Sequence, residues 1–260
     1  MAWNRRNFLS SFVGFGLSLA TNRTLAVASR KAEGLPCWSY HGSEGPDHWG
    51  CLHPDWAACA EGLEQSPIVL PDGKAIPADE RLTLDYRATT GRLSERTHTV
   101  QVDLAPGSRL VFGNQAFFLR QFHFHTPSEH RWSDSADVGE LHLVHVADSG
   151  GIAVLGIALR PGAPWAFPES FWDWLKVAEA GETLTLDPTD LVPRQGRFLG
   201  YRGSLTTPPC TEGVLWLLAT EPMTVGLEER RWLERRMGQN ARPVQSLGSR
   251  IVHTILRGGS

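Results

Sequence analysis

Histidines recur at short spacing in two stretches of this sequence, where their imidazoles could hold a metal ion. The first stretch, residues 121–125, reads QFHFH, and the second, residues 140–145, reads ELHLVH. Both alternate as β-strands do, so His123 and His125 point to one face of the first strand. If the two strands are neighbours, His142 converges with them on one point. Three imidazoles leave the fourth tetrahedral position of Zn²⁺ open to water, which is the arrangement of a catalytic zinc site.

Each of these strands also carries a polar residue that could orient a metal ligand. Gln121 and Glu140 each lie two residues before a histidine, on the same strand face. A metal-bound imidazole needs an acceptor for its second ring nitrogen, which an amide or a carboxylate supplies. A His-x-His pair alone is more often two half-buried polar residues, but a second strand of matching parity favours a metal site. The histidines without such partners are interpreted as structural or exposed: His41, His48, His53, His130, His145 and His253.

The elements that must hold these histidines are short strands. Between residues 82 and 255, alternating or apolar runs are separated by turn signals, which predicts a central, mostly antiparallel and twisted β-sheet. Gly113-Asn114 and residues 148–151 predict tight turns between antiparallel neighbours. The predicted strands span residues 82–86, 99–104, 109–112, 116–124, 140–147, 152–159, 196–201 and 214–220.

Helical periodicity is confined to residues 169–178 and 227–237, and the chain before residue 82 is predicted to be irregular and to wrap over the sheet. We therefore predict a β-dominated α/β fold, a single domain with short peripheral helices. A net charge of −3 argues against a nucleic-acid-binding protein. No apolar run reaches the roughly 18 residues that a membrane-spanning helix needs.

The N-terminal residues resemble an export signal of the twin-arginine type. Two adjacent arginines precede an apolar stretch, residues 8–20, and residues 26–28 read AVA, a small-residue cleavage site. We predict a signal peptide over residues 1–28, a mature domain over residues 29–260, and a periplasmic or secreted location. The mature part holds four cysteines, an even number that is consistent with two disulfides in an oxidising compartment. A four-thiolate zinc site is disfavoured, because no Cys-x-x-Cys pair is present.

Beyond these patterns, several segments resemble the signature segments of the alpha-class carbonic anhydrases, in their bacterial, exported form. The strongest matches are residues 121–130 (QFHFHTPSEH), 140–145 (ELHLVH) and 203–212 (GSLTTPPCTE). Further agreement comes from residues 38–40, 45–50, 65–68, 98–102 and 240–245. Because the matching segments follow one another in the family's order from about residue 36 to 256, the resemblance is highly specific.

The resemblance implies a role for each site residue. The implied zinc ligands are His123, His125 and His142, with Gln121, Glu140 and the backbone carbonyl of Asn240 as their hydrogen-bond partners. Thr206 resembles the family's gatekeeper threonine, which accepts a hydrogen bond from zinc-bound hydroxide and donates one to a buried carboxylate, here Glu129. The implied CO₂ pocket consists of Val144, Val154, Leu205, Thr207 and Trp216. His98 matches the histidine that carries protons to solvent, through waters that are ordered by Tyr40, Gln101 and Thr207.

The implied activity is the reversible hydration of CO₂ to bicarbonate and a proton, with Zn²⁺ and no organic cofactor. The implied partners are CO₂ and bicarbonate, and we predict no nucleic acid, no membrane span and a homodimer as one possible assembly. Three alternatives stay open: a non-catalytic binding module of the same fold, an exported metal carrier, which His-x-His also suits, and a zinc hydrolase. The intact histidines argue against the first alternative, and the pair Thr206 and Glu129 argues against the second.

The resemblance also implies a disulfide pairing. Exported members of the family join a cysteine near the start of the domain to one after the double proline, which assigns Cys59 to Cys210. The remaining cysteines, Cys37 and Cys51, are expected to pair with each other.

One departure from the family lies beside the predicted proton shuttle. Where the family often has Asn-Gly-His, this chain has Arg96-Thr97-His98. If the chain is extended there, Arg96 shares a face with His98, and its permanent charge would lower the pKa of that imidazole. We then expect slower proton export, with the zinc site unaffected.

Overall fold

The strands of this chain build one large sheet, which is described from a computed structural model. The structure describes residues 36–71, 75–132, 137–163 and 169–258. The chain divides into a short unit, Met1–Cys37, and a main unit, Trp38–Ser260, to which all helices and strands given below belong. The predicted signal peptide, residues 1–28, lies outside the described residues.

The large sheet contains the eight predicted strands, with shifted ends, and four more that were not predicted. In chain order, the strands are β2 (Ile76–Asp85), β3 (Thr89–Glu95), β4 (Val100–Leu104), β5 (Arg109–Phe112), β6 (Gln115–His125), β8 (Gly139–Val146), β9 (Ile152–Pro161), β10 (Thr183–Leu186), β11 (Arg197–Ser204), β12 (Glu212–Ala219), β13 (Met223–Val225) and β14 (His253–Arg257). The four that were not predicted are β3, β10, β13 and β14. Two further strands, β1 (Val69–Leu70) and β7 (Arg131–Trp132), pair separately and in parallel. The turns at Gly113-Asn114 and residues 148–151 join antiparallel neighbours, as predicted.

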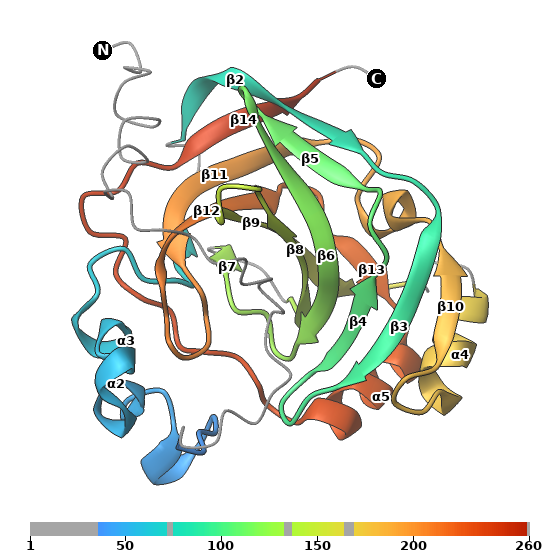
Figure 1. Ribbon diagram of the computed structural model, residues 1–260, viewed down its shortest axis with the longest axis horizontal. Helices are drawn as coiled ribbons and strands as arrows, with labels where there is room; N and C mark the ends of the chain where they lie inside the picture. Colours follow the sequence, from blue (N-terminus) through green and yellow to red (C-terminus); the bar gives the residue numbers. More distant parts are fainter. Residues whose placement is uncertain (1–35, 72–74, 133–136, 164–168, 259–260) are drawn as a thin grey trace. The chain divides into compact units, whose positions relative to one another are not determined.

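The strand pairings of the large sheet close on themselves. β8 pairs with both β6 and β9, so the series of neighbours β6, β5, β2, β14, β11, β12, β9 and β8 returns to β6 (Figure 1). β4, β3 and β10 extend the sheet from β6, and β13 pairs with β9. The pairings are antiparallel except for β9 with β12, β9 with β13 and β2 with β14. The predicted mostly antiparallel central sheet is confirmed, as a mixed sheet.

The two histidine strands are direct neighbours in this sheet. β6 and β8 run antiparallel, with His123 opposite His142 and His125 opposite Glu140. On its other side β6 pairs with β4, where Gln101 lies opposite His123. Seven of the eight residues of β8 are buried, with β9 completing its pairing. The histidines therefore project from strands whose positions are fixed on both sides.

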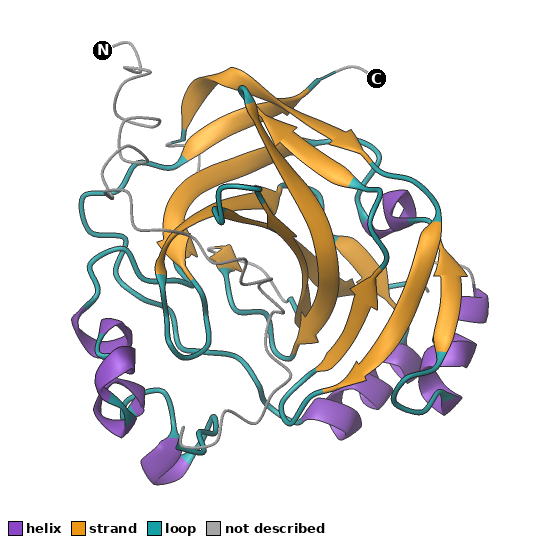
Figure 2. Ribbon diagram, viewed as in Figure 1, coloured by secondary structure: helices purple, strands orange, loops and turns teal. Residues whose placement is uncertain are grey.

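The helices are few and lie beside the sheet (Figure 2). α5 (Leu227–Met237) has the predicted bounds, and α4 (Glu169–Val177) ends one residue before the predicted end. The segment before residue 82 was expected to be irregular, which is corrected: where the structure describes it, it contains four short helical turns, η2 (Gly42–Glu44), α2 (Trp49–Leu52), η3 (Pro54–Trp56) and α3 (Ala58–Glu61). These turns bury two tryptophans against the Cys59 and Cys210 side chains, which gives a Trp-rich segment a core of its own. A further turn, η4 (Pro188–Leu191), follows β10.

Several strands escaped the sequence analysis because their local patterns are poor. β2 begins six residues before the predicted start, in a stretch that contains Pro77 and acidic residues. β3 reads TTGRLSE, and neither β3, β10 nor β14 was predicted. β14 forms because it pairs with both β11 and β2, a contact between distant segments that no local propensity reveals.

The cysteines confirm one predicted disulfide and contradict the other. Cys59 and Cys210 are joined. Cys37 and Cys51 are free and exposed, so their predicted mutual bond is wrong. Trp49 is the buried residue of α2, and a residue two positions along a helix points to the far side, which turns Cys51 toward solvent. Within the described residues, no helix is long and apolar enough to cross a membrane.

Candidate metal centre

The three histidines predicted as metal ligands meet at one point, and we call them the histidine cluster. The ring centroids of His123 and His125 are 5.0 Å apart, those of His123 and His142 5.2 Å, and those of His125 and His142 4.6 Å. One nitrogen from each ring lies within 4.8 Å of the other two. The register between β6 and β8 produces this convergence, as the strand parity predicted.

Each ring of the cluster has its outer nitrogen occupied. Nδ1 of His123 lies 2.9 Å from Oε1 of Gln121, Nδ1 of His125 lies 2.7 Å from the carbonyl oxygen of Asn240, and Nε2 of His142 lies 2.9 Å from Oε1 of Glu140. Because all three partner atoms accept hydrogen bonds, each of these nitrogens donates, and the opposite nitrogen keeps its lone pair. These contacts are the ones expected from the sequence.

The inner nitrogens fit a metal ion. Nε2 of His125 is buried and has no hydrogen-bond partner among the described residues, which is costly unless a cation occupies the space in front of it. Burial lowers the pKa of all three imidazoles, that of His123 well below its usual value and that of His125 to about 4. Neutral imidazole is the form that binds metal, so the donor set suits a divalent cation such as Zn²⁺.

Glu140 is the centre of the hydrogen bonds around the cluster. Its Oε1 lies 2.7 Å from the His130 ring as well as 2.9 Å from His142, and its Oε2 accepts from Ser128 Oγ and from the backbone N–H groups of Glu129 and His130. Burial raises the pKa of Glu140, but His130 and His142 lower it by more, so it stays ionised. Glu140 therefore holds a ligand and the loop after β6 together.

His130 belongs to the site, although sequence reasoning set it aside as structural or exposed. It is buried, and its Nε2 lies 2.6 Å from the hydroxyl of Tyr201, which in turn lies 2.8 Å from Oγ of Ser66. Alternation gives no signal for His130, because it follows the end of β6. Its second partner, Tyr201, lies on β11, a strand distant in sequence that no local pattern connects to His130.

The predicted relay residues, Glu129 and Thr206, lie beside the cluster. Oε1 of Glu129 accepts from the backbone N–H of Arg242 at 2.9 Å and lies 3.6 Å from Nδ1 of His125. Burial raises the pKa of Glu129 to about 7, against the lowering effects of His142, the Arg242 N–H and Thr206. Oε2 of Glu129 is buried and has no hydrogen-bond partner among the described residues, so the hydrogen bond from the Thr206 hydroxyl stays a prediction.

Arg242 supports the segment around Glu129. No sequence pattern singled it out. Its guanidinium is buried and donates to Oε1 of Gln65 and to the carbonyls of Ser66 and Cys59, at 2.8 to 2.9 Å. The backbone that supports Glu129 is thus tied to the disulfide-bonded segment.

The residues predicted to hold CO₂ share one apolar cluster. Val144, Val154 and Trp216 are buried in it, and Leu205 packs against it. The Trp216 ring lies 4.9 Å from the ring of His142 and donates its indole N–H to the carbonyl of Ser204 at 2.9 Å. Thr207 is partly buried, and its carbonyl accepts from the N–H of Cys210.

The predicted proton shuttle lies in residues 96–99, the link between β3 and β4, which we call the shuttle turn. Nε2 of His98 lies 2.9 Å from the carbonyl oxygen of Trp38, and its ring packs 4.3 Å from the Trp38 ring and 5.8 Å from that of Tyr40. Gln101, expected to order water, is buried and donates to Asp103 at 2.6 Å.

The predicted effect of Arg96 on His98 is not found. Residues 97–99 bend, so the extended chain assumed for that prediction does not exist. The pKa of His98 is lowered, but by burial, which the Trp38 carbonyl partly opposes. The charge of Arg96 is instead one of the smaller causes that lower the pKa of His123.

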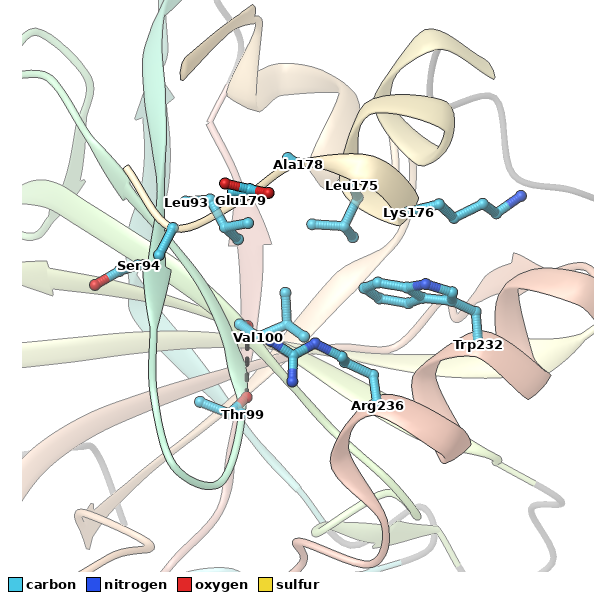
Figure 3. Close-up of a pocket in the computed structure, with 11 residues that line it drawn as sticks. Leu93, Ser94, Thr99, Val100, Leu175, Lys176, Ala178, Glu179, Trp232 and Arg236 are labelled. Carbon is cyan, nitrogen blue, oxygen red and sulfur yellow. Dashed lines mark hydrogen bonds between the residues drawn. The ribbon is translucent and has the colours of Figure 1, made fainter. Parts of the chain in front are cut away.

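A pocket of about 450 Å³ lies behind the shuttle turn, between the β3–β4 hairpin, α4 and α5 (Figure 3). Val100, Leu175, Trp232 and Arg236 are among the residues that line it. Side chains alternate along β4, so Val100 faces this pocket while Gln101 points to the face that carries His123. The pocket is therefore separate from the histidine cluster.

Comparison with known proteins agrees with this fold and site. The family model described as eukaryotic-type carbonic anhydrase matches residues 44–255. A carbonic anhydrase of Nostoc is 39% identical over 242 residues, covering 90% of this chain and 92% of the relative. An alpha carbonic anhydrase structure from Thermovibrio ammonificans, with the inhibitor sulfanilamide, has a TM-score of 0.78 at 36% identity and covers 85% of this chain and 100% of that one.

The chain belongs to the alpha, or eukaryotic-type, carbonic anhydrase family of enzymes. A dioscorin solved in complex with ascorbate also has a TM-score of 0.78, at 31% identity over 86% of this chain and 100% of the other. Proteins with different names thus share this fold, so the argument for function depends on the site.

Proposed function

We propose that this chain catalyses the reversible hydration of CO₂ to bicarbonate and a proton, with Zn²⁺ held by His123, His125 and His142. The observation that carries the proposal is the histidine cluster: three buried rings with their outer nitrogens committed and their inner nitrogens within 4.8 Å of one another. Bound Zn²⁺ would supply Lewis acidity, which in carbonic anhydrases lowers the pKa of the bound water to about 7.

Thr206 and Glu129 orient the attacking water. An ionised carboxylate only accepts hydrogen bonds, so the hydroxyl proton of Thr206 is committed to Glu129. The Thr206 oxygen then accepts a hydrogen bond from the water, whose lone pair is directed toward CO₂. Burial raises the pKa of Glu129 to about 7 against the lowering effects of the Arg242 N–H and Thr206, so the relay operates in the ionised form that predominates above that pH.

The apolar cluster beside His142 binds CO₂. Val144, Val154, Leu205 and Trp216 offer no hydrogen bonds to water from their packed side chains, apart from the indole N–H that Ser204 occupies. An apolar molecule such as CO₂ is favoured there over water. Thr207, two residues after Leu205 in the chain, is assigned to the substrate site by the family resemblance.

His98 carries the released proton toward solvent. Its lowered pKa keeps the imidazole neutral at neutral pH, which leaves it able to accept a proton; the same shift weakens proton uptake and eases release to solvent. We assign Tyr40 and Gln101 to the ordering of the intervening waters, because the Tyr40 ring lies 5.8 Å from that of His98 and Gln101 lies opposite His123 in the strand register. Tyr40 stays protonated, because burial raises its pKa well above the usual value.

Zinc analysis combined with CO₂ hydration tests the proposal against its alternatives. We expect Zn²⁺ in the purified protein and hydration that is lost on chelation. A metal carrier would bind the ion without hydrating CO₂, and a non-catalytic module would do neither. Ester hydrolysis without CO₂ hydration would indicate a zinc hydrolase.

We further propose that residues 1–28 are a twin-arginine-type export signal and that residues 29–260 work in the periplasm or outside the cell. The Cys59–Cys210 disulfide supports this location, because such bonds persist in oxidising compartments. N-terminal sequencing of the exported protein should find a start near residue 29. Replacing both Arg5 and Arg6 with Lys should keep the full-length chain in the cytoplasm, and unchanged export would refute the signal.

A further inference from the structure

The side chain of Asn240 joins three segments of the chain. Asn240 follows α5 and is only 1% exposed. Its Nδ2 donates to the carbonyl of His98 at 2.8 Å and to the carbonyl of Phe124 at 3.1 Å. Its Oδ1 accepts from the N–H of Thr126 at 2.7 Å. The amide therefore connects the shuttle turn to the end of β6.

The backbone of the same residue contacts the metal centre. Its carbonyl accepts from Nδ1 of His125 at 2.7 Å, and its N–H donates to the carbonyl of Thr126 at 2.9 Å. Asn240 thus touches a proposed metal ligand with its backbone and the shuttle turn with its side chain. The position of Asn240 therefore affects both the hydrogen bond to His125 and the hydrogen bond to the shuttle turn.

Thr99 adds a second attachment next to His98. Its hydroxyl donates to the carbonyl of Phe124 at 2.6 Å, the same carbonyl that accepts from Asn240. The shuttle turn links β3 to β4. Among the described strands, the edge of β3 that does not pair with β4 pairs only with the short strand β10. The hydrogen bonds from Asn240 and Thr99 therefore attach the turn to the end of β6, in addition to the pairing of β4 with β6 and the contact of His98 with the Trp38 carbonyl.

We propose that Asn240 is a positioning residue whose side-chain amide fixes the shuttle turn relative to His125, so that its loss slows proton export while metal binding and CO₂ attack persist. The inference rests on the proposed function. It assigns to the side chain a role separate from that of the backbone carbonyl, which alone was expected to hold His125.

The chemistry of the position requires an amide. The three neighbours are two carbonyl acceptors and one N–H donor, and a carboxamide offers two donor hydrogens and an acceptor oxygen in one plane. Asn240→Ala removes all three contacts and keeps the backbone carbonyl that His125 uses. Gln239→Ala is the matched control, because it removes an exposed amide from the next residue.

The test uses the full zinc-loaded chain in dilute buffer. For Asn240→Ala we expect kcat to fall by up to about tenfold and by no more than in His98→Ala, since a misplaced shuttle is at worst a lost one. The ratio kcat/KM should stay within about twofold, because it ends at bicarbonate release and does not include proton export. Zinc content should match the wild type, added imidazole should restore kcat, and Gln239→Ala should behave like the wild type.

A second readout needs no activity. Hydrogen exchange of the backbone amides in residues 96–100 should be faster in Asn240→Ala than in Gln239→Ala, with or without zinc. Thr99→Val is isosteric and removes the bond to Phe124 together with two longer contacts of the hydroxyl, to the carbonyl of Val100 at 3.4 Å and to Sδ of Met237 at 3.7 Å. It should change exchange and kcat in the same direction by less. It decides the matter if Asn240→Ala does not fold.

The outcomes separate the two proposals. An inactive wild-type enzyme would refute the proposed function. The exchange measurement would still test whether the Asn240 side chain fixes the shuttle turn. If the wild type is active and neither Asn240→Ala nor Thr99→Val changes kcat or hydrogen exchange, the positioning role of Asn240 is refuted and the proposed function is not. Parallel loss of zinc, kcat and kcat/KM in Asn240→Ala would also refute the positioning role, because the residue would then act on the ligand.

Discussion

The histidine cluster and the shuttle turn are both built on β6 and its neighbours, yet they are held in different ways. The cluster projects from two adjacent strands, each paired on both sides, and every ring has a hydrogen-bond partner of its own. The turn links two strands near the end of the sheet and depends on contacts from Trp38, Asn240 and Thr99. Strand register fixes the first region, and single hydrogen bonds between the turn and distant segments hold the second.

This difference explains what the variants should do. A change in the cluster should remove the metal, a change in the relay should slow attack, and a change in the turn should slow only proton export. The expected effects decrease in that order.

His142→Ala should have the largest effect. Removing a third ligand should cost more metal affinity than loss of a ligand's partner, which typically costs about 10- to 100-fold, so most zinc and nearly all CO₂ hydration should be lost. Metal content and hydration rate are the measurements. His145→Gln, on the same strand but the opposite face, is the control and should keep its zinc.

Thr206→Val should slow the reaction and leave the metal in place. The variant keeps the size of the side chain and removes the group that orients the attacking water, and loss of one such contact typically costs about a hundredfold in rate. Zinc content should equal that of the wild type. If Thr206→Val lost zinc as completely as His142→Ala, the two roles would be wrongly assigned.

His98→Ala should affect a single step. In dilute buffer, kcat should fall by about tenfold or more, with kcat/KM preserved, because only the proton relay is removed. Added imidazole should restore the rate by replacing the lost base. An unchanged kcat would mean that protons leave by another route.

Acid stability should distinguish the two faces of β8. Burial lowers the pKa of His145 to about 3 from its usual 6.5, while its Nε2 lies 2.7 Å from the hydroxyl of Tyr86. The folded state therefore disfavours the protonated ring, so His145 should lower stability progressively as the pH falls from 6.5 toward 3. Melting temperatures between pH 7 and pH 4 should fall less steeply in His145→Gln. Equal slopes would show that His145 does not titrate in the unfolding transition.

Arg96→Asn should have the smallest effect. Arg96 is not among the causes that lower the pKa of His98, so that pKa, followed by NMR titration, should not move, and kcat should stay within about twofold. A clear rise in both the pKa of His98 and kcat would support the repulsion between Arg96 and His98 that the sequence predicted.

The contrast also marks what the sequence was able to predict. Alternation along residues 121–125 and 140–145 was sufficient for the ligand convergence and for the contacts of Gln121 and Glu140, because strand parity is a local property. The position of Asn240 came only from the family resemblance.

What escaped prediction depends on contacts between distant segments. The roles of His130 and Arg242 require β11 and the disulfide-bonded segment to be in place. The bend at residues 97–99 follows from the pairing of β3, a strand whose sequence has no clear alternation. The pairing of Cys37 with Cys51 was inferred by counting cysteines, which says nothing of the side of α2 on which Cys51 lies.

The central claim is that the histidine cluster holds one catalytic Zn²⁺ ion, and metal removal with stepwise reconstitution tests it most directly. The zinc-free protein should not hydrate CO₂, and activity should return in proportion to added Zn²⁺ until one ion per chain is bound. Full hydration by the zinc-free protein, or saturation with Zn²⁺ without any return of hydration, would contradict the account.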